Sequence, residues 1–316
     1  EDLSAVGRAR RLRPLVRSAL ATWPLDVTRV RLITNDYNGV FRVDARQGVF
    51  ALRVNLPRRT DAELRAELAW LAALREAAVV DVPRSIPTAQ GRPWAVATAD
   101  GVPGPRRCVL FTWLPGRSLA PADDPEAFRG FGVAIARLHV HAAGWRAPRG
   151  VVAWDRPFPM EPGTLFAQPL TSRVRAVMTD ALAATEEGLR RLWDAGDRPR
   201  ITHHDLHVEN VRIHRLRLAI LDFDDSLIAF PAQDLGVSVF QNRMRGCPPR
   251  ALRAIRHGYE RVAAWPDERD VETFVAATAM DLTNAVYQDF DPGYWAAAGR
   301  YAARWATIAA AALRRI

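Results

Sequence analysis

The pattern of apolar residues changes from mostly strand-like to mostly helical at Pro115-Gly116, and this change limits the folds that the sequence can adopt. Before it, short segments rich in Val, Phe and Leu alternate with turn residues, as in consecutive antiparallel strands. These segments span residues 27–33, 39–44, 49–54, 94–98 and 107–114. One amphipathic helix interrupts them and begins at Thr60, where Glu63 can complete a capping box. Residues 1–114 therefore predict a lobe built from an antiparallel sheet and one key helix.

Beyond this break, apolar residues repeat at helical spacing and predict a larger, mostly helical lobe over residues 115–316. The expected helices span residues 125–142, 171–195, 232–245, 249–264, 271–288 and 294–314. The strand-like interval 211–223 predicts a hairpin that turns at His214-Arg215. Residues 1–23 predict an arginine-rich amphipathic helix, and residues 147–168 an ordered loop. A chain of 316 residues is long enough for two cores, so we expect a two-lobed α+β fold.

The composition narrows the class of protein. Hydrophobic residues make up 49% and charged residues 25% of the chain, as in ordinary globular proteins. The apolar stretch 305–313 is shorter than the ~20 residues that a membrane span needs, so we expect no membrane insertion. Cys108 and Cys247 lie far apart, which argues against a disulfide framework and for a cytoplasmic protein.

The basic residues are not distributed as in a nucleic-acid-binding surface. The net charge is +9, and all 44 basic residues are arginine. These arginines are scattered through every segment and form no run with interleaved aromatic residues, so we expect no nucleic-acid partner.

The most informative polar residues flank the expected hairpin. The segment before it reads Thr202-His203-His204-Asp205-Leu206-His207-Val208-Glu209-Asn210, and the one after it Leu221-Asp222-Phe223-Asp224-Asp225. Phosphoryl transfer needs a carboxylate that orients the attacking hydroxyl and accepts its proton, together with hard oxygen ligands for Mg²⁺. Asp205 is the candidate catalytic base, and Asn210 and Asp222 are the candidate metal ligands.

Other interpretations of these residues were weighed. The three histidines beside Asp205 are candidates for a zinc site, although they lack the spacing of metallohydrolase ligands. Asp and Asn also cap helices and form turns, but the joint spacing here favours catalysis. One of Asp224 and Asp225 is a candidate for a second metal ion, the other for a turn cap, and we expect Asp234 to anchor the loop or a helix start.

The two segments resemble the catalytic loop and metal-binding turn of the aminoglycoside phosphotransferase, choline kinase and homoserine kinase superfamily. Its loop, His-Gly-Asp-Leu-His-x-x-Asn, is matched over residues 203–210, with His204 in place of glycine. Its Ile-Asp-Phe turn is matched at 221–223, and its later Asp-Leu-Gly at 234–236. Further similarity occurs at residues 67–71, 82–83, 114–116 and 136–139. The resemblance implies a protein-kinase-like fold and Mg²⁺-dependent transfer of the γ-phosphoryl group of ATP or GTP to a hydroxyl of a small molecule.

The resemblance also implies nucleotide contacts in the first lobe. A cation of the third strand pairs with a helix glutamate and reaches the phosphates. Here these residues are Arg53 and Glu67, because the chain has no lysine. The loop at 34–39 has a single glycine and offers Asn38 and Gly39 as weaker phosphate-binding candidates. The expected adenine-binding hinge consists of Phe111, Thr112, Trp113 and Leu114.

The acceptor class is the most open question. Acidic residues dominate 267–291, against the single Arg269, and relatives build part of the acceptor pocket from these C-terminal helices. A carboxylate-rich pocket would favour amine-bearing acceptors. The acids of 267–272 also suit a solvent-facing helix start. The remaining acceptor candidates are Asp281, Asn284, Tyr287 and Asp289.

Four functions fit these features. The acceptor of a kinase is an antibiotic such as an aminoglycoside, a metabolite such as homoserine, choline or a sugar-like alcohol, or a protein Ser or Thr. The fourth is a nucleotide-binding pseudokinase without activity, although the chain keeps both the expected base and the expected metal ligands.

Overall fold

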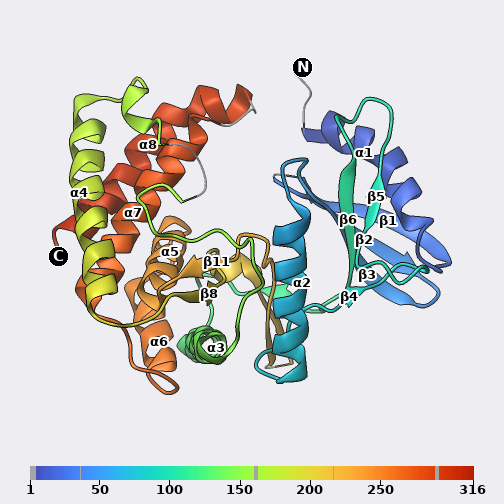
Figure 1. Ribbon diagram of the computed structural model, residues 1–316, viewed down its shortest axis with the longest axis horizontal. Helices are drawn as coiled ribbons and strands as arrows, with labels where there is room; N and C mark the ends of the chain where they lie inside the picture. Colours follow the sequence, from blue (N-terminus) through green and yellow to red (C-terminus); the bar gives the residue numbers. More distant parts are fainter. Residues whose placement is uncertain (1–4, 36, 160–162, 216, 289–291) are drawn as a thin grey trace. The chain divides into compact units, whose positions relative to one another are not determined.

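The computed structural model describes residues 5–35, 37–159, 163–215, 217–288 and 292–316 (Figure 1). The chain divides into two compact units. The first consists of Glu1–Arg75 and Val82–Pro115, and the second of Glu76–Asp81 and Gly116–Ile316. An antiparallel sheet forms the N-terminal part and helices dominate the C-terminal part, as the sequence predicts for an α+β fold.

The first unit contains an antiparallel sheet in the order β1-β2-β3-β6-β4, and β5 also pairs with β6. The strands are β1 (Val27–Asn35), β2 (Gly39–Ala45), β3 (Gly48–Val54), β4 (Ser85–Ile86), β5 (Ala95–Ala97) and β6 (Arg106–Thr112). The five predicted strands are confirmed. The sequence did not predict β4, because two residues are too few for an alternating pattern.

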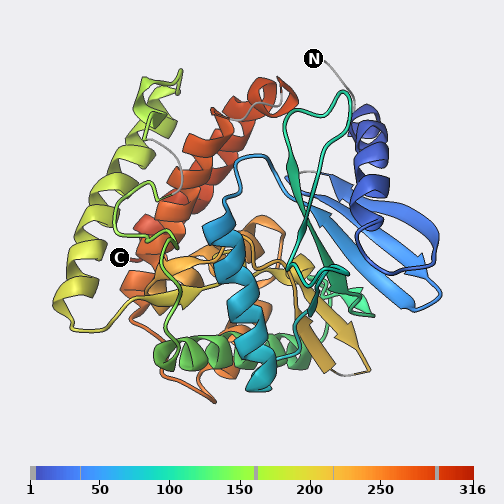
Figure 2. The ribbon, with the colours of Figure 1, turned by 45° about the vertical axis from the view of Figure 1, so that its right-hand side comes forward.

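Helix α1 (Ala5–Leu20) covers one face of this sheet, as Figures 1 and 2 show. Its buried residues Leu15, Val16 and Ala19 belong to the same hydrophobic cluster as Phe41 and Leu52 of the sheet. The predicted amphipathic helix is therefore confirmed over the described residues. Its apolar face closes the core of the first unit.

Helix α2 (Asp61–Glu76) begins with the predicted capping box. The Glu63 carboxylate accepts from the Thr60 N–H at 2.8 Å, and the Glu63 N–H donates to the Thr60 hydroxyl at 3.2 Å. Leu64, Leu68 and Leu71 are buried, as their helical spacing predicts. The helix thereby holds Glu67, its buried carboxylate, against the sheet.

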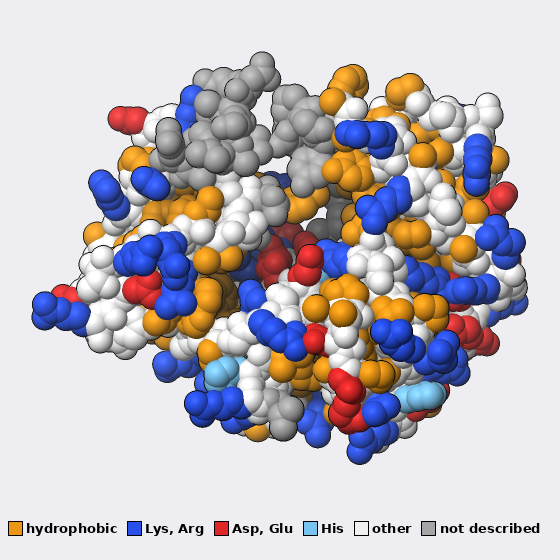
Figure 3. Space-filling view, turned by 180° about the vertical axis from the view of Figure 1, so that it is seen from behind, with side chains coloured by type: hydrophobic (Ala, Val, Ile, Leu, Met, Phe, Trp, Pro, Cys, Tyr) orange, Lys and Arg blue, Asp and Glu red, His pale blue; other side chains and the backbone are white. Residues whose placement is uncertain are grey.

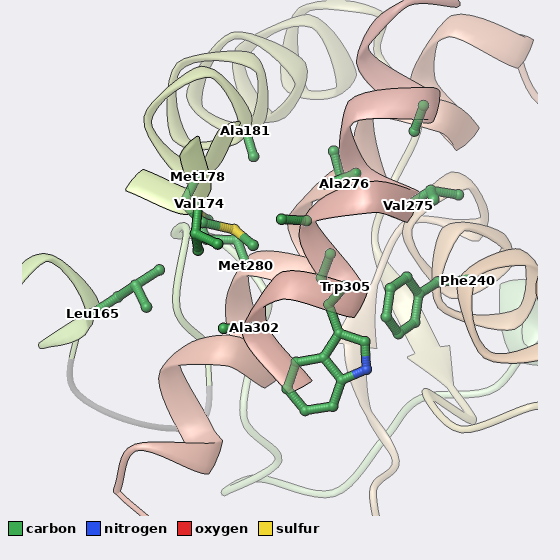
Figure 4. Close-up of a cluster of buried hydrophobic side chains, with 14 of the residues drawn as sticks. Leu165, Val174, Met178, Ala181, Phe240, Val275, Ala276, Met280, Ala302 and Trp305 are labelled. Atoms are coloured by element: carbon green, nitrogen blue, oxygen red, sulfur yellow. The ribbon is translucent and has the colours of Figure 1, made fainter. Parts of the chain in front are cut away.

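The second unit is mostly helical. Its helices are α3 (Pro125–Gly144), α4 (Ser172–Asp194), α5 (Pro231–Met244), α6 (Pro249–Tyr259), α7 (Glu268–Val286) and α8 (Pro292–Leu313). Figure 4 shows its hydrophobic core, in which Met178 of α4, Met280 of α7 and Trp305 of α8 lie close together. The prediction for α6 was too long, because the N–H groups of Val262 and Ala263 both bond to the Tyr259 carbonyl and end the helix.

Helices α3 and α6 cross at two glycines. A Cβ atom at Gly132 would lie 1.9 Å from the carbonyl oxygen of Ile255, and one at Gly258 would lie 2.0 Å from that of Arg129. Both contacts are with backbone, which cannot move aside as a flexible side chain can. Glycine is therefore required at both positions for the two helices to approach this closely.

Short strands frame the loop that carries the candidate catalytic residues. The predicted hairpin is present as β9 (Val211–His214) and β10 (Arg217–Ile220), and β7 (Arg117–Ser118) pairs with β9. A second pair joins β8 (Arg200–Thr202) to β11 (Leu227–Ala229). The sequence did not predict β7, β8 and β11, because they have only two or three residues each.

The surface carries its charges in dispersed form. Figure 3 shows arginine side chains scattered over one face, with acidic side chains among them. Across the described part of the chain, every helix is too short or too polar to cross a membrane. Cys108 and Cys247 are buried free thiols.

Candidate active site

The loop between β8 and β9 is braced from within by His203. This residue is fully buried, and its Nε2–H donates to the carbonyl of Leu221 at 2.8 Å. Its Nδ1 accepts from the backbone N–H of Asp205 at 3.3 Å, which assigns the proton to Nε2. Burial lowers the pKa of His203, so the ring is neutral and can keep both bonds. His203 therefore ties the start of the loop to the strand end at Leu221.

Two side chains donate hydrogen bonds to the Asp205 carboxylate, and a third lies beside it. Its Oδ2 accepts from the Asn210 amide at 2.9 Å, and its Oδ1 accepts from the Gln241 amide at 3.0 Å. The Nε2 of His207 lies 3.2 Å from Asp205 Oδ2. The Asp205 side chain keeps 20% of its surface exposed. Asp205 is therefore fixed in one orientation while it remains accessible.

The candidate metal ligands lie at the two ends of the hairpin. The amide nitrogen of Asn210 also donates to the backbone carbonyl of Asp205 at 2.9 Å, so its Oδ1 is the atom directed away from these bonds. Leu221 links the two ends of the hairpin. Its N–H donates to the Asn210 carbonyl at 2.8 Å, and its carbonyl accepts from His203 Nε2–H. Asp222 follows directly and is exposed, with φ at 62°, a conformation that Asp tolerates better than most residues.

The donor set fits Mg²⁺ better than zinc. An amide oxygen and a carboxylate are hard ligands, and Mg²⁺ commonly takes few protein ligands and completes its shell with water and phosphate oxygens. The side chains of His203 and His207 are bonded within the loop, and the His204 ring packs on Trp154. Among residues that the structure describes, His, Cys, Asp and Glu form no group of three or more that could hold a metal ion.

Asp234 anchors the catalytic loop, as expected from the sequence. It is buried at the start of α5, and its Oδ1 accepts from the His204 N–H at 2.6 Å. Its Oδ2 accepts from His139 Nε2 at 2.8 Å, and His139 Nδ1 accepts from the Tyr259 hydroxyl at 3.0 Å. Burial raises the pKa of Asp234, but the hydrogen bond and charge of His139 outweigh it and lower the pKa overall. The loop is thus tied to helices α3, α5 and α6.

His204 adopts the backbone conformation that explains the glycine of the related motif. Its φ is 66°, in the left-handed region that glycine enters without steric cost. The edge of its ring packs on Trp154 at a centroid distance of 5.0 Å, and its buried Nδ1 has no hydrogen-bond partner among the described protein groups. Burial lowers the pKa of His204 to about 4.

In the first unit, the expected Arg53–Glu67 ion pair is present. Arg53 of β3 and Glu67 of α2 are both buried, with 2.6 Å between Nη2 and Oε2. Arg59 adds a second bond to the same oxygen at 3.2 Å, and the Arg53 guanidinium lies over the Phe111 ring. Arg59 was not predicted from the sequence, although it directly precedes the helix-capping residue Thr60. Two cations against one carboxylate leave a net positive charge.

Asn38 and Gly39, the two phosphate-binding candidates between β1 and β2, both have structural contacts. The Oδ1 of Asn38 accepts from the Leu56 N–H at 3.3 Å. A Cβ atom at Gly39 would lie 3.0 Å from the side chain of Leu12 on α1, so packing alone explains this glycine. Their proposed contact with phosphate stays a prediction.

The expected hinge follows β6. Phe111 is buried within that strand, and Leu114 is half-buried after it. The backbone N–H of Thr112 donates to the Arg84 carbonyl at 2.8 Å, and that of Trp113 donates to the Val49 carbonyl at 3.2 Å. These two N–H groups are therefore already bonded within the sheet unit.

The residues predicted to bind the acceptor differ in their burial and contacts. Asn284 is buried on α7, and its Oδ1 accepts from the Thr164 N–H at 3.0 Å, so it ties a loop to the helix. Tyr287 ends α7 and packs against the hydrophobic core, and burial raises its pKa. Asp281 is half-buried on α7, and Asp289 lies outside the described residues.

The acidic helix start is neutralised in three dimensions. Glu272 was expected to face solvent, and this is wrong: its carboxylate is 1% exposed and bonds Arg243 at 2.5 Å and Arg315 at 2.7 Å. These partners are far away in the sequence, which is why the pattern could not reveal them. Asp270 similarly pairs with Arg191 at 2.8 Å. Both of these helix-start acids are therefore neutralised by arginines.

An open pocket of about 740 Å³ lies beside the loop within the second unit. Charged side chains dominate one part of its wall, and these are Glu209, Arg243, Arg245 and Arg304. Arg245 bonds Glu209 at 2.7 Å, and Arg304 donates to the Met244 carbonyl at 2.5 Å. The pocket is therefore more basic than acidic.

Asp205 lies beside Asn210 and Asp222 follows the hairpin, where the sequence motifs predict a catalytic loop and a metal-binding turn. The model of the phosphotransferase enzyme family matches residues 29–271, and the chain belongs to this family. As a member of this family it is a phosphotransferase.

Individual proteins that resemble this chain share 30% or less of its sequence in the comparisons below. An uncharacterized protein of Deinococcus radiodurans is 30% identical over 254 residues, which cover 74% of this chain and 71% of the relative. A microcompartment-associated aminopropanol kinase has a TM-score of 0.77 at 23% identity, covering 96% of this chain and 98% of its own. An amicoumacin kinase solved with AMP-PNP, Ca²⁺ and Ami has a TM-score of 0.76 at 17% identity, with coverages of 96% and 95%. At these identities the solved structures establish the fold alone.

Proposed function

We propose that this protein is an ATP- and Mg²⁺-dependent kinase of a small, amine-bearing alcohol, with Asp205 as the catalytic base. The observation that carries the proposal is the Asp205 carboxylate, which Asn210 and Gln241 orient by hydrogen bonds while 20% of its side-chain surface stays exposed. A carboxylate held in this way can align an attacking hydroxyl and accept its proton.

Asn210 and Asp222 would hold Mg²⁺, which when bound neutralises the charge that develops on the phosphoryl group. Arg53 and Arg59 supply guanidinium groups for the nucleotide phosphates, and Glu67 fixes both. ATP is favoured over GTP because the similar amicoumacin kinase was solved with AMP-PNP.

The amine-bearing acceptor has support from one similar protein, the aminopropanol kinase, whose chain and ours cover each other almost completely. The pocket beside the loop favours a second candidate. Because three arginines and one glutamate line it, an acceptor that also carries an acidic group, such as an amino-acid alcohol, would be attracted there.

Acceptor-dependent ADP production tests both candidates. The panel should contain aminopropanol, choline, an aminoglycoside, homoserine and a neutral sugar alcohol, each with Mg²⁺ and either ATP or GTP. We expect the highest kcat/KM with ATP and an amine-bearing acceptor. Homoserine alone would support the second candidate, and strict selectivity for the neutral alcohol would refute both. Binding of nucleotide without any turnover would instead indicate a pseudokinase.

A further inference from the structure

Gln241 lies outside every motif that points to the active site, yet it contacts the proposed base directly. It is on α5, and its Nε2 donates to Asp205 Oδ1 at 3.0 Å. This bond supplies the only described side-chain donor to that oxygen, whereas Oδ2 accepts from Asn210 and faces His207. Without Gln241 the carboxylate could rotate about its Cβ–Cγ bond.

The orientation of the Gln241 amide is itself defined. Arg245, one helical turn further along, donates from Nη1 to Gln241 Oε1 at 2.6 Å. Because a guanidinium can only donate, this contact assigns the oxygen to the Arg245 side and the NH₂ group to the Asp205 side. Arg245 is in turn held by Glu209 at 2.7 Å.

We infer that Gln241 is a positioning residue for phosphoryl transfer, acting through Asp205, and that Arg245 keeps its amide in the productive orientation. The inference rests on the proposed role of Asp205 as the base. A rotated carboxylate would still be present, but it would no longer be aligned with the attacking hydroxyl. Loss of alignment lowers kcat more than it changes nucleotide binding.

Two substitutions separate positioning from packing. Gln241→Met keeps the side-chain volume but removes the donor. Gln241→Glu keeps an acceptor for Arg245 but places a second carboxylate against Asp205. The matched control is Gln233→Met on the same helix, since the buried Gln233 amide bonds only the backbone groups of Trp154 and Phe230 among its described contacts.

The assay is steady-state ADP production from Mg-ATP with aminopropanol, repeated without acceptor as ATP hydrolysis, on folded protein of known melting temperature. We expect both Gln241 variants to lower kcat by about 10- to 100-fold and to leave the KM for ATP within about threefold. Gln233→Met should lower the melting temperature and leave kcat within about twofold. In an Asp205→Ala background, Gln241→Met should cause no further loss, because both residues act as one unit.

Three results would overturn the inference while the function stands. These are a kcat of Gln241→Met within about twofold of the parent, an equal loss in Gln233→Met, or an undiminished further loss in the Asp205→Ala background. Parent-like turnover by Asp205→Ala alone would refute the proposed function, and the inference with it.

Discussion

The buried anchor of the catalytic loop gives a prediction that can be worked out from its contacts. Asp234→Ala would remove the acceptor of two buried donors, the His204 N–H and the Nε2–H of His139. Each orphaned buried donor costs about 1–3 kcal/mol, so the loss of the acceptor of both donors falls near the middle of a combined range of about 2–6 kcal/mol. We therefore expect Asp234→Ala to lower the free energy of unfolding by about 3–5 kcal/mol.

Asp234→Asn should cost much less, because the network can rewire. The Asn oxygen can accept from the His204 N–H, while its NH₂ group donates to Nε2 of a His139 that carries its proton on Nδ1. The Tyr259 hydroxyl, now 3.0 Å from Nδ1, can rotate and accept that proton. What remains is the loss of charge in two hydrogen bonds, about 1–2 kcal/mol.

Urea unfolding at pH 7, followed by tryptophan fluorescence and by circular dichroism, measures both values. Asp180 on α4 is exposed, so Asp180→Ala is the control and should change stability by less than about 0.5 kcal/mol. Equal destabilisation by Asp234→Ala and Asp234→Asn would refute the reasoning, because satisfaction of the two donors would then not be what Asp234 contributes.

The remaining predictions concern chemistry and pH. Asp205→Ala should lower kcat by about 10²–10⁴-fold, with little change in nucleotide affinity measured by calorimetry. Asp222→Ala should lower kcat and also weaken the binding of Mg-nucleotide. Normal turnover by either variant would remove the substituted residue from the mechanism. Arg53→Lys should keep partial activity and Arg53→Ala much less, since a lysine restores charge but not the two-pronged geometry; identical rates would show that the fork is unused. The folded-state pKa of His204, about 4, lies below its ordinary 6.5, so the unfolded chain binds the proton first and stability falls as pH drops from 6.5 towards 4. His204→Gly should reduce this loss by about 1–3 kcal/mol in unfolding curves taken across that range, and an unchanged slope would contradict it.

Local sequence patterns predicted most of the fold. The capping box at Thr60 located the start of α2, and alternating apolar residues located the longer strands of the sheet. What the patterns missed depends on distant partners. The strand pair β8–β11 has three residues on each side, and its pairing is set by the loop that it encloses. The pairing of Glu272 with Arg243 and Arg315 arises only when α5, α7 and the C-terminal segment pack together.

The candidate site divides in the same way. Asp205, Asn210 and Asp222 could be predicted, because their spacing along the chain is itself the signal, and the expected Arg53–Glu67 contact is present. Gln241 could not, since it lies 36 residues from Asp205 and reaches it only through the packing of α5. Nothing in a short segment around Gln241 distinguishes it from a polar helix residue.

The glycine crossing of α3 and α6 places a control point for activity far from the reacting atoms. Tyr259 directly follows Gly258, and His139 lies about two turns after Gly132 on α3. The spacing of the two helices at the crossing therefore sets the distance between the Tyr259 hydroxyl and the His139 ring. A single methyl group at either glycine would force the helices apart and draw the Tyr259 hydroxyl away from His139. Because the whole tether of the catalytic loop starts from that contact, these two positions are natural places to engineer a temperature-sensitive form of the enzyme, one that loses activity on mild warming although every residue of its catalytic loop is unchanged.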